Sequence, residues 1–368
     1  MNCKKVLLSA IGFLMISGTV NASTTLPLKG SIVKASDPRI VYTGRISFAS
    51  PDAPTFSYPG TQIIARFEGT SLKMIAKPMS GYFMAQIDQA EPFKVSFNAP
   101  KDSVVTLATA LADGTHTVRL MYAVEGLDYK PVFKGFVLDT GRQLAEPPVL
   151  PQRKIEFIGN SITCGYGNES IEKSDPFEYE TENHYYTYAA ETARNLNAQH
   201  WVVARSGIGV YRNYDGPKTG NADCMPAQYE YTLFNNKSEK WDFSRFTPDV
   251  VCINLGTNDL STNNYDVKRL RQAYIDFIQT VRRHYPQAKI VMLVGSMLNG
   301  KELDIAKKML NEVVADYNKQ GDKEIYRFDF TPQNGDLFYG ASWHPSIWQH
   351  QKMAGELTAF LRTLMQWF

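Results

Sequence analysis

The sequence predicts two domains of different class, an all-β sandwich followed by a three-layer α/β/α domain with a parallel sheet. The chain has 368 residues, which is longer than a usual single domain. Residues 31–141 contain short segments rich in β-forming residues and separated by turn residues. After the proline-rich stretch 147–151, apolar strands alternate with segments of helical periodicity. We therefore expect the sandwich at residues 23–147 and the α/β domain at residues 148–368.

The first 22 residues have the pattern of a signal peptide. Lys4 and Lys5 precede an apolar run over residues 6–16, and small residues follow up to Ala22. The run is too short to span a bilayer, and no later segment of the sequence is apolar enough to do so. The pattern predicts cleavage after Ala22 and a secreted or periplasmic protein.

The sequence predicts that the N-terminal domain consists of strands. The expected strands cover residues 61–67, 71–77, 83–87, 93–97, 104–112 and, with one buried face, 117–122. Many short strands without helices favour a β-sandwich of the jelly-roll type. Tyr58 and Tyr82 offer aromatic rings that could bind a sugar, but surface aromatics are common without function. We favour a structural role for this domain.

Composition limits the partners and cofactors. The net charge is +2 and no long basic run occurs, which argues against nucleic acid or an anionic membrane surface as a partner. After the signal peptide three cysteines remain, which allow at most one internal disulfide. A bond between Cys164 and Cys224 is possible, whereas Cys252 lies in an apolar strand. No cysteine or histidine spacing resembles a zinc site. We expect no metal and no cofactor. We also expect a monomer.

The C-terminal domain shows strands alternating with helices. The expected strands are residues 155–158, 201–204, 250–255, 290–294 and 325–328, and apolar residues recur at helical spacing over 270–281, 303–317 and 353–364. Ser346 and Gln349 form a capping box before the last helix. This order predicts a parallel sheet with helices on both faces.

Four short motifs follow predicted strands, and each carries a residue suited to acyl chemistry. Ser161 follows the first strand, and Gly207 follows the second, where a glycine lets a backbone N–H approach a ligand. Asn258 follows the third strand and can donate a hydrogen bond to an oxyanion. His344 lies just before the final helix and can act as a general base. Each motif alone could be an ordinary turn.

The four motifs together form a pattern that is more specific than any of its parts. Ligands of open α/β sheets collect at the carboxyl ends of the strands, so these residues are expected to meet there. A serine hydroxyl needs a base to become a nucleophile, and a histidine is available. The remaining histidines, at positions 116, 184, 200, 284 and 350, lie within predicted strands or helices and are expected to be structural or solvated.

The four motifs together resemble those of a known family. The segments Gly-Asn-Ser-Ile-Thr, Ser-Gly, Gly-Thr-Asn-Asp and the late His-Pro are similar to the four blocks of the SGNH (GDSL-type) hydrolases over residues 153–368. The segments 159–167, 211–214, 241–245 and 343–346 resemble carbohydrate esterase family 2, secreted deacetylases that also carry an N-terminal jelly-roll domain. The second resemblance covers the whole mature chain.

The resemblance implies roles for individual residues. Ser161 would be the nucleophile and His344 the general base. The oxyanion hole would consist of the backbone N–H groups of Ser161 and Gly207 and the side chain of Asn258, with Gly209 as a neighbouring alternative to Gly207. SGNH enzymes usually place an aspartate three residues before the histidine, but Ala341 stands there.

A main-chain carbonyl replaces that aspartate in several family 2 esterases. We therefore expect the carbonyl of Trp343 to orient the imidazole of His344, with Asp336 as the rival. A carbonyl can fix the tautomer but stabilises the imidazolium less than a carboxylate.

The implied activity is removal of O-acetyl groups from plant polysaccharides or oligosaccharides, such as xylan or glucomannan, through an acetyl-serine intermediate. Trp343 and Tyr166 flank the expected crevice and could stack on sugar rings, although core packing is the alternative for both. Two other functions remain open at this point. One is a lipase-like esterase of other acyl esters, and the other is a glycan-binding protein without catalysis.

Overall fold

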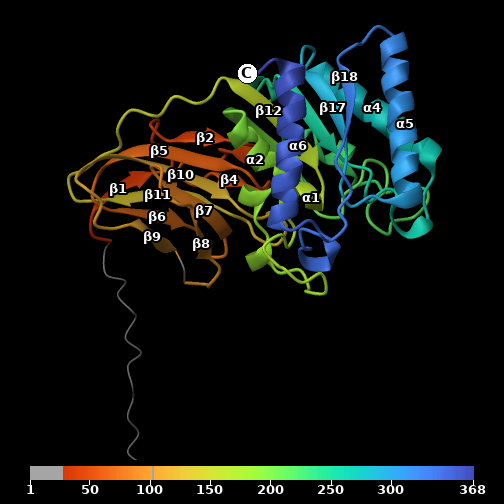
Figure 1. The fold of residues 1–368 in the computed structure, drawn as a ribbon. Coiled ribbons are helices and arrows are strands. Elements are labelled where there is room, and N and C mark those ends of the chain that lie inside the picture. Colours follow the sequence, from red (N-terminus) through yellow and green to blue (C-terminus); the bar gives the residue numbers. More distant parts are fainter. Residues whose placement is uncertain (1–27, 102) are drawn as a thin grey trace, which may run out of the picture.

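The computed structural model describes residues 28–101 and 103–368, and it shows an all-β unit followed by an α/β unit (Figure 1). The predicted signal peptide, residues 1–22, lies outside the described residues. The strands of the first unit lie side by side with the helices and strands of the second, and residues of both units pack together at their contact.

The N-terminal unit is a sandwich of two antiparallel sheets. One sheet has the order β1-β11-β6-β9 and the other the order β2-β5-β10-β7-β8. The strand bounds are β1 Ser31–Lys34, β2 Val41–Thr43, β5 Gln62–Gly69, β6 Leu72–Ala76, β7 Gly81–Ile87, β8 Phe93–Phe97, β9 Val104–Ala108, β10 Gly114–Tyr122 and β11 Phe133–Leu138. A short pair, β3 Ile46–Ser47 and β4 Thr55–Phe56, completes it. The predicted β-sandwich is therefore confirmed.

Alternation along the strands places one face of each sheet in the sandwich core. On β10, Val118, Leu120 and Tyr122 are fully buried, and they pack with residues of the opposite sheet such as Met74 and Phe136.

One interpretation of the N-terminal aromatics was wrong for Tyr58. This ring is 1% exposed and packs into the core of the second unit, so it is not available to a sugar at the surface. Tyr82 is partly buried and lies edge-on against Tyr129.

The C-terminal unit has a five-stranded parallel sheet with helices on both faces, as predicted. The strand order is β13-β12-β16-β17-β18. The strands are β12 Arg153–Gly159, β13 Ala198–Ala204, β16 Val250–Asn254, β17 Lys289–Val294 and β18 Ile325–Asp329. The helices are α1 Ser161–Cys164, α2 Tyr188–Asn195, α3 Met225–Gln228, α4 Val267–His284, α5 Gly300–Lys319 and α6 Ile347–Met365, and a hairpin, β14 Tyr231–Leu233 and β15 Asn236–Lys240, lies outside the sheet.

Successive residues of the central strands face two different helix layers. Val251 and Ile253 pack with the apolar residues of α4 and α5, whereas Val250 and Cys252 pack with those of α2 and α6. Figure 1 shows α6 on one side of the sheet and α4 and α5 on the other side. Burial on both faces explains why these strands are continuous apolar runs in the sequence.

A buried ion pair joins the two units. Arg45, which precedes β3, lies 3.4 Å from Glu156 of β12, and both side chains are 1% exposed. Arg45 also donates to the carbonyl oxygens of Tyr229 and Tyr231, and its guanidinium lies over the Trp241 ring at 5.3 Å from the centroid. The contact between the two units therefore combines an ion pair, hydrogen bonds to backbone carbonyls and a cation–π contact.

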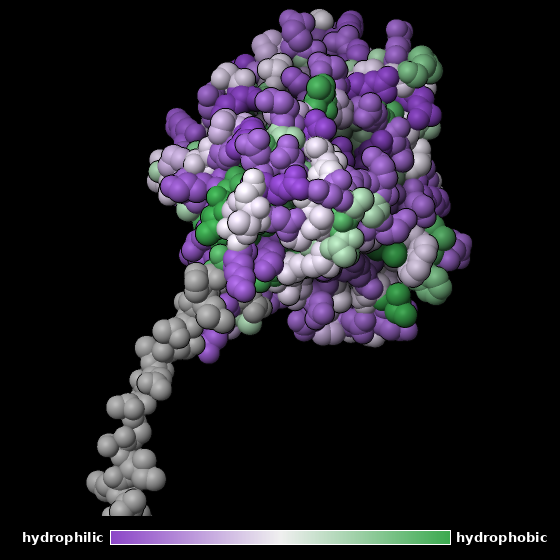
Figure 2. All heavy atoms as spheres, turned by 90° about the vertical axis from the view of Figure 1, so that its left-hand side faces the viewer, coloured by the Kyte–Doolittle hydropathy of each residue, from purple (hydrophilic) through white to green (hydrophobic). Residues whose placement is uncertain are grey.

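The face of the molecule seen in Figure 2 is mostly hydrophilic, and the described cysteines are buried. Figure 2 shows that hydrophilic residues dominate one face of the molecule, with apolar atoms only in scattered patches. In the described part of the chain, no helix is both long and apolar enough to cross a bilayer. Cys164, Cys224 and Cys252 are buried free thiols, so the structure contains no bond between Cys164 and Cys224.

Candidate active site

The turn after β12 places Ser161 at the first position of the short helix α1. Asn160 caps this helix, because its side chain accepts a hydrogen bond from the backbone N–H of Ile162 at 3.1 Å. Gly159 must be a glycine, since a Cβ there would lie 2.0 Å from Oγ1 of Thr163. The tight turn aims the serine out of the sheet, where its residue is 6% exposed.

Three neighbouring strands bring the nucleophile and the expected oxyanion donors together. β12 lies between β13 and β16, so the chain connections after β12 and β16 leave in opposite directions along the sheet. Such a switch point leaves a crevice at the carboxyl ends of the strands. Ser161, Gly207 and Asn258 follow β12, β13 and β16, and all three line one cavity of about 680 Å³.

The donors in this cavity are held by the backbone around them. Asn258 Nδ2 donates one hydrogen bond to the carbonyl of Ile208 at 2.8 Å, which fixes the amide and leaves its second N–H for a ligand. Gly207 lines the cavity with φ of 75°, whereas the N–H of Gly209 is used by Asn213 Oδ1 at 3.1 Å. The geometry therefore favours Gly207 over Gly209 as the second donor.

His344 reaches the serine from the loop that precedes α6. Its Nε2 lies 2.9 Å from Ser161 Oγ, across 183 residues of sequence. Nδ1 lies 3.1 Å from the carbonyl oxygen of Ala341 and 3.2 Å from that of Ser342. Since a carbonyl can only accept, Nδ1 carries the proton and Nε2 is the acceptor for the serine hydroxyl.

The expectation that the Trp343 carbonyl orients His344 is wrong in this structure. That carbonyl accepts a hydrogen bond from Gln333 Nε2 at 2.7 Å instead. Ser342 and Trp343 have φ of 51° and 60°, so the chain turns through two left-handed residues. This turn carries the carbonyls two and three residues before the histidine onto its ring.

The rival Asp336 is not the orienting group either. Its side chain accepts a hydrogen bond from Asn334 Nδ2 at 2.6 Å, a neighbour in its own loop.

The imidazole of His344 is tuned by its surroundings. Burial in the protein lowers the pKa of His344 to about 4, and the hydrogen bonds to the Ala341 and Ser342 carbonyls act weakly in the opposite direction. At neutral pH the ring is therefore uncharged, which is the form that can accept a proton from the serine.

The two aromatic candidates for substrate contact differ. Tyr166 lines the cavity, but its ring is stacked on His344 and on Phe177, each at 4.2 Å between centroids. With a ring on each face, Tyr166 can meet a substrate only through its edge and hydroxyl, so the expected face-on stacking of a sugar is not available. Trp343 is 55% exposed and is not among the described residues that line the cavity.

Two carboxylates that sequence reasoning missed hold the loops of this site. Glu125, from the N-terminal unit, accepts a hydrogen bond from the backbone N–H of Ser206 at 2.7 Å, next to Gly207. Asp259 accepts from the backbone N–H groups of Tyr211 and Arg212 at 2.8 and 3.0 Å. Asp259 belongs to the Gly-Thr-Asn-Asp motif, in which only Asn258 is predicted to take part in the site, whereas Glu125 lies in no recognisable pattern.

Glu125 belongs to a small buried cluster with Cys164 and Glu182, whose polar atoms lie within 4.8 Å of one another. Burial raises the pKa of the Cys164 thiol well above its usual value, and it raises the pKa of both carboxyl groups. A protonated thiol is a poor metal ligand. Cys164 Sγ lies 3.7 Å from Glu125 Oε2, and Glu182 accepts from the backbone N–H of Glu125, so the cluster is a hydrogen-bond network.

Comparisons with known proteins agree with this geometry. The family model "Carbohydrate esterase 2 N-terminal" matches residues 42–148, and the "GDSL-like Lipase/Acylhydrolase family" model matches residues 157–351. An "Acetylxylan esterase / glucomannan deacetylase" of Cellvibrio japonicus is 31% identical over 94% of this chain and 95% of its own length. The chain is a member of carbohydrate esterase family 2.

Other members of the family extend the comparison. "Cellulase/esterase CelE" of Acetivibrio thermocellus is 41% identical over 90% of this chain, but this chain spans only 40% of the length of that relative. A family two carbohydrate esterase from Clostridium thermocellum, solved in complex with cellohexaose, has a TM-score of 0.83 and 41% identity, over 89% of this chain and all of that one. The predicted family and fold are thereby confirmed.

Proposed function

We propose that this family 2 carbohydrate esterase removes O-acetyl groups from polysaccharides or oligosaccharides of the xylan or glucomannan type. The observation that carries the proposal is the 2.9 Å contact between Ser161 Oγ and His344 Nε2 inside the cavity that Asn258 and Gly207 also line. The related "Acetylxylan esterase / glucomannan deacetylase" of Cellvibrio japonicus supports the substrate class.

In the first half of the reaction, His344 Nε2 takes the proton of Ser161 as Oγ attacks the acetyl carbonyl carbon. The carbonyl oxygen becomes an oxyanion, and the N–H groups of Ser161, Gly207 and Asn258 donate to it. When the tetrahedral intermediate collapses, the bond to the sugar oxygen breaks and His344 returns its proton to that oxygen. The products are the free sugar hydroxyl and an acetyl-serine.

In the second half, water attacks the acetyl-serine and His344 accepts its proton. Collapse of the second tetrahedral intermediate releases acetate and gives the proton back to Ser161 Oγ. Throughout, two carbonyl oxygens hold the imidazole in place of a carboxylate. They fix the tautomer, but the charged imidazolium gains less from a carbonyl dipole than from a full negative charge.

The test is acetate release from acetylated xylan and acetylated glucomannan. Ser161→Ala and His344→Ala should each lower kcat by about 10³-fold or more, as in other nucleophile–base pairs, because neither the nucleophile nor its base can be replaced by a neighbour. Circular dichroism should show both variants folded. Turnover like that of the wild type in either variant would contradict the proposed roles.

A second measurement separates this proposal from its alternatives. 4-Nitrophenyl acetate should be hydrolysed much faster than a long-chain 4-nitrophenyl ester, and rapid quenching followed by mass spectrometry should find an acetyl group on Ser161. A preference for the long chain would favour the lipase-like esterase. Saccharide binding without acetate release would favour a glycan-binding protein.

We also propose export through the N-terminal signal pattern. Supporting residues are Lys4 and Lys5, the apolar run and the small residues that end at Ala22. N-terminal sequencing of the exported protein should give Ser23 as the first residue, and retention of Lys4 and Lys5 in that protein would contradict cleavage.

A further inference from the structure

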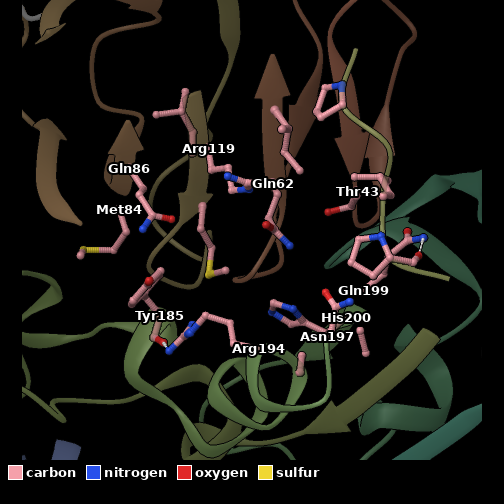
Figure 3. Close-up of a pocket in the computed structure, with 18 of the residues that line it drawn as sticks. Thr43, Gln62, Met84, Gln86, Arg119, Tyr185, Arg194, Asn197, Gln199 and His200 are labelled. Carbon is pink, nitrogen blue, oxygen red and sulfur yellow. Dashed lines mark hydrogen bonds between the residues drawn. The ribbon is translucent and has the colours of Figure 1, made fainter. Parts of the chain in front are cut away.

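A second cavity lies between the two units, away from the catalytic residues. Its volume is about 360 Å³, at the lower end of the range of small-ligand sites. One wall is the exposed face of the N-terminal sheet, formed by β2, β5, β10 and β7, and the other is the C-terminal end of α2 with the start of β13 (Figure 3). We call this cavity the interdomain groove.

The groove lies at the opposite end of the parallel sheet from Ser161. Ala198 and Gln199, which line it, pair with the first two residues of β12, whereas Ser161 follows the last residue of that strand. β12 has 7 residues. At about 3.3 Å per residue the two sites are roughly 20 Å apart along the strand. A ligand in the groove therefore leaves the catalytic cavity free.

Two arginines give the groove its charge. Arg119 of β10 and Arg194 of α2 come from opposite walls, and Figure 3 shows both among the residues around the same space. Both residues are exposed, and within residues 28–101 and 103–368 neither side chain forms an ion pair. The described lining contains no aspartate or glutamate. The described lining therefore carries positive charge with no carboxylate of its own, and Asp88 and Glu191, which interact with Arg119 and Arg194 electrostatically, lie outside the lining.

Carboxamides and apolar side chains surround these arginines. The amide-bearing lining residues are Gln62, Gln86, Gln89, Asn197 and Gln199. A carboxamide both donates and accepts, so it can pair with a hydroxyl in either sense. Ile64, Met84 and Met121 are buried beneath them and provide an apolar floor.

The tyrosine ring of the groove, Tyr185, is not free to stack on a ligand. The Arg194 guanidinium lies 4.0 Å from the centroid of the Tyr185 ring, and it also donates to the Tyr185 carbonyl at 2.8 Å. His200, the other ring in the lining, is 3% exposed, so the described lining offers no open aromatic platform of the kind that a neutral sugar chain would use. It offers instead guanidinium groups that can bind a carboxylate through paired hydrogen bonds.

From this lining we propose that the interdomain groove binds an acidic saccharide, a sugar unit that carries one carboxylate and several hydroxyl groups. Arg119 and Arg194 hold the carboxylate, the carboxamides hold the hydroxyls, and the apolar floor contacts the C–H face of the ring. This site goes beyond the proposed esterase activity and does not depend on it.

Isothermal titration calorimetry with two probes tests the proposal. One probe is a neutral xylotetraose, and the other is the same tetrasaccharide with a single glucuronic acid side group. Neither carries an acetyl group, so the result is independent of catalysis. At low salt the acidic probe should bind about tenfold more tightly or better, and the advantage should shrink as salt screens the charges.

Variants connect the effect to the groove. Arg119→Gln and Arg194→Gln should each remove most of the advantage of the acidic probe. Arg66→Gln is the matched control, because Arg66 lies on β5 two residues beyond Ile64, on the same face, but outside the lining of the groove. Arg119→Lys, which keeps the charge, should retain part of the advantage. Thermal unfolding should show that these variants are folded.

Three results would overturn the proposal. One is equal affinity of the wild-type protein for the two probes. Another is an advantage of the acidic probe that survives in the Arg119→Gln/Arg194→Gln double variant. The third is inorganic phosphate binding as tightly as the acidic probe, since that would make the groove a general anion site.

Discussion

At the scale of single residues, the candidate site depends on how one imidazole is held. Two carbonyl oxygens, of Ala341 and Ser342, face Nδ1 of His344 and leave Nε2 for Ser161. The ring is desolvated without a neighbouring carboxylate, and desolvation disfavours the charged form of a histidine. This explains why the pKa of His344 falls to about 4 rather than rising.

The first prediction concerns the pH dependence of activity. A base with a lowered pKa keeps its active neutral form at lower pH, so kcat/KM should stay level from neutral pH to about 5 and fall with a midpoint near 4. The measurement is kcat/KM for 4-nitrophenyl acetate against pH, with circular dichroism to show that the protein stays folded at each point. A midpoint near 6.5, the usual histidine value, would contradict the environment described for His344.

The second prediction concerns Glu125, which acts on the reaction through the backbone of Ser206. Glu125→Ala removes the acceptor that holds the N–H next to Gly207. Loss of one oxyanion donor costs about 10²–10³ in kcat, so a displaced donor should cost about tenfold, with KM little changed. Glu125→Gln keeps an acceptor oxygen and should recover most of kcat. Equal activity of both variants and the wild type would show that Glu125 does not position the loop.

At the scale of elements, a single buried carboxylate ties together the loops after two strands of the sheet. Asp259 is fully buried and collects backbone N–H groups from two loops, those of Val210, Tyr211 and Arg212 after β13 and that of Gly256 after β16. This carboxylate ties the loop that carries Gly207 to the loop that carries Asn258. Both proposed oxyanion donors therefore depend on one side chain.

The third prediction concerns this tie. Asp259→Ala leaves several buried N–H groups without an acceptor, each of which costs about 1–3 kcal/mol. We expect the free energy of unfolding to fall by about 3 kcal/mol or more, and kcat to fall strongly even below the unfolding temperature, because both donor loops are released. Chemical denaturation and acetate release measure the two effects. Asp242→Ala, which removes an exposed cap on a short turn after β15, is the control and should change the free energy of unfolding only slightly.

At the scale of the whole molecule, the sandwich is part of the catalytic unit rather than an appendage. It supplies Glu125 to the active-site loops and Arg45 to the buried pair with Glu156. Glu156 also accepts a hydrogen bond from the Tyr229 hydroxyl at 2.6 Å, so its carboxylate is satisfied from both units. A buried charge that loses its partner is strongly destabilising.

The fourth prediction follows from this pair. Arg45→Met leaves Glu156 buried without its cation and should lower the free energy of unfolding by about 3–5 kcal/mol. Arg142→Met is the matched control, because the Arg142–Asp113 pair is exposed on both sides and such pairs contribute about 0–1 kcal/mol. Denaturant unfolding measures both. Equal losses in the two variants would contradict the role given to the Arg45–Glu156 contact.

Much of this architecture could be read from local patterns. The strands of the α/β domain are buried on both faces, so they stand out as apolar runs, and the capping of α6 by Ser346 through the backbone N–H of Gln349 was visible as a short motif. The order of the motifs along the predicted strands also places Ser161 and His344 in one expected site. These signals are local in sequence, which is why they could be recognised there.

The errors concern contacts that no local pattern records. The sequence predicts that the carbonyl of Trp343 orients His344, but two left-handed residues, Ser342 and Trp343, redirect the chain. Non-glycine residues rarely adopt this conformation, so the residue types at these two positions do not predict it. The sequence predicts an exposed ring for Tyr58 because nothing in the chain around it shows that the second unit covers it.

The amino-acid sequence by itself determined the two fold classes, the order of the strands along the chain, and the serine, glycine, asparagine and histidine that the family pattern contains. Periodicity and short motifs carry that information, since they reflect interactions between near neighbours. Only the tertiary structure decided what holds these residues in place, namely the carbonyls of Ala341 and Ser342 and the carboxylate of Glu125, and only it revealed the separate groove with Arg119 and Arg194. The contacts of Glu125 and the groove join segments far apart in the chain, and they exist only once the two domains have packed together. The carbonyls of Ala341 and Ser342 are near His344 in sequence, but they reach Nδ1 only because Ser342 and Trp343 adopt left-handed conformations.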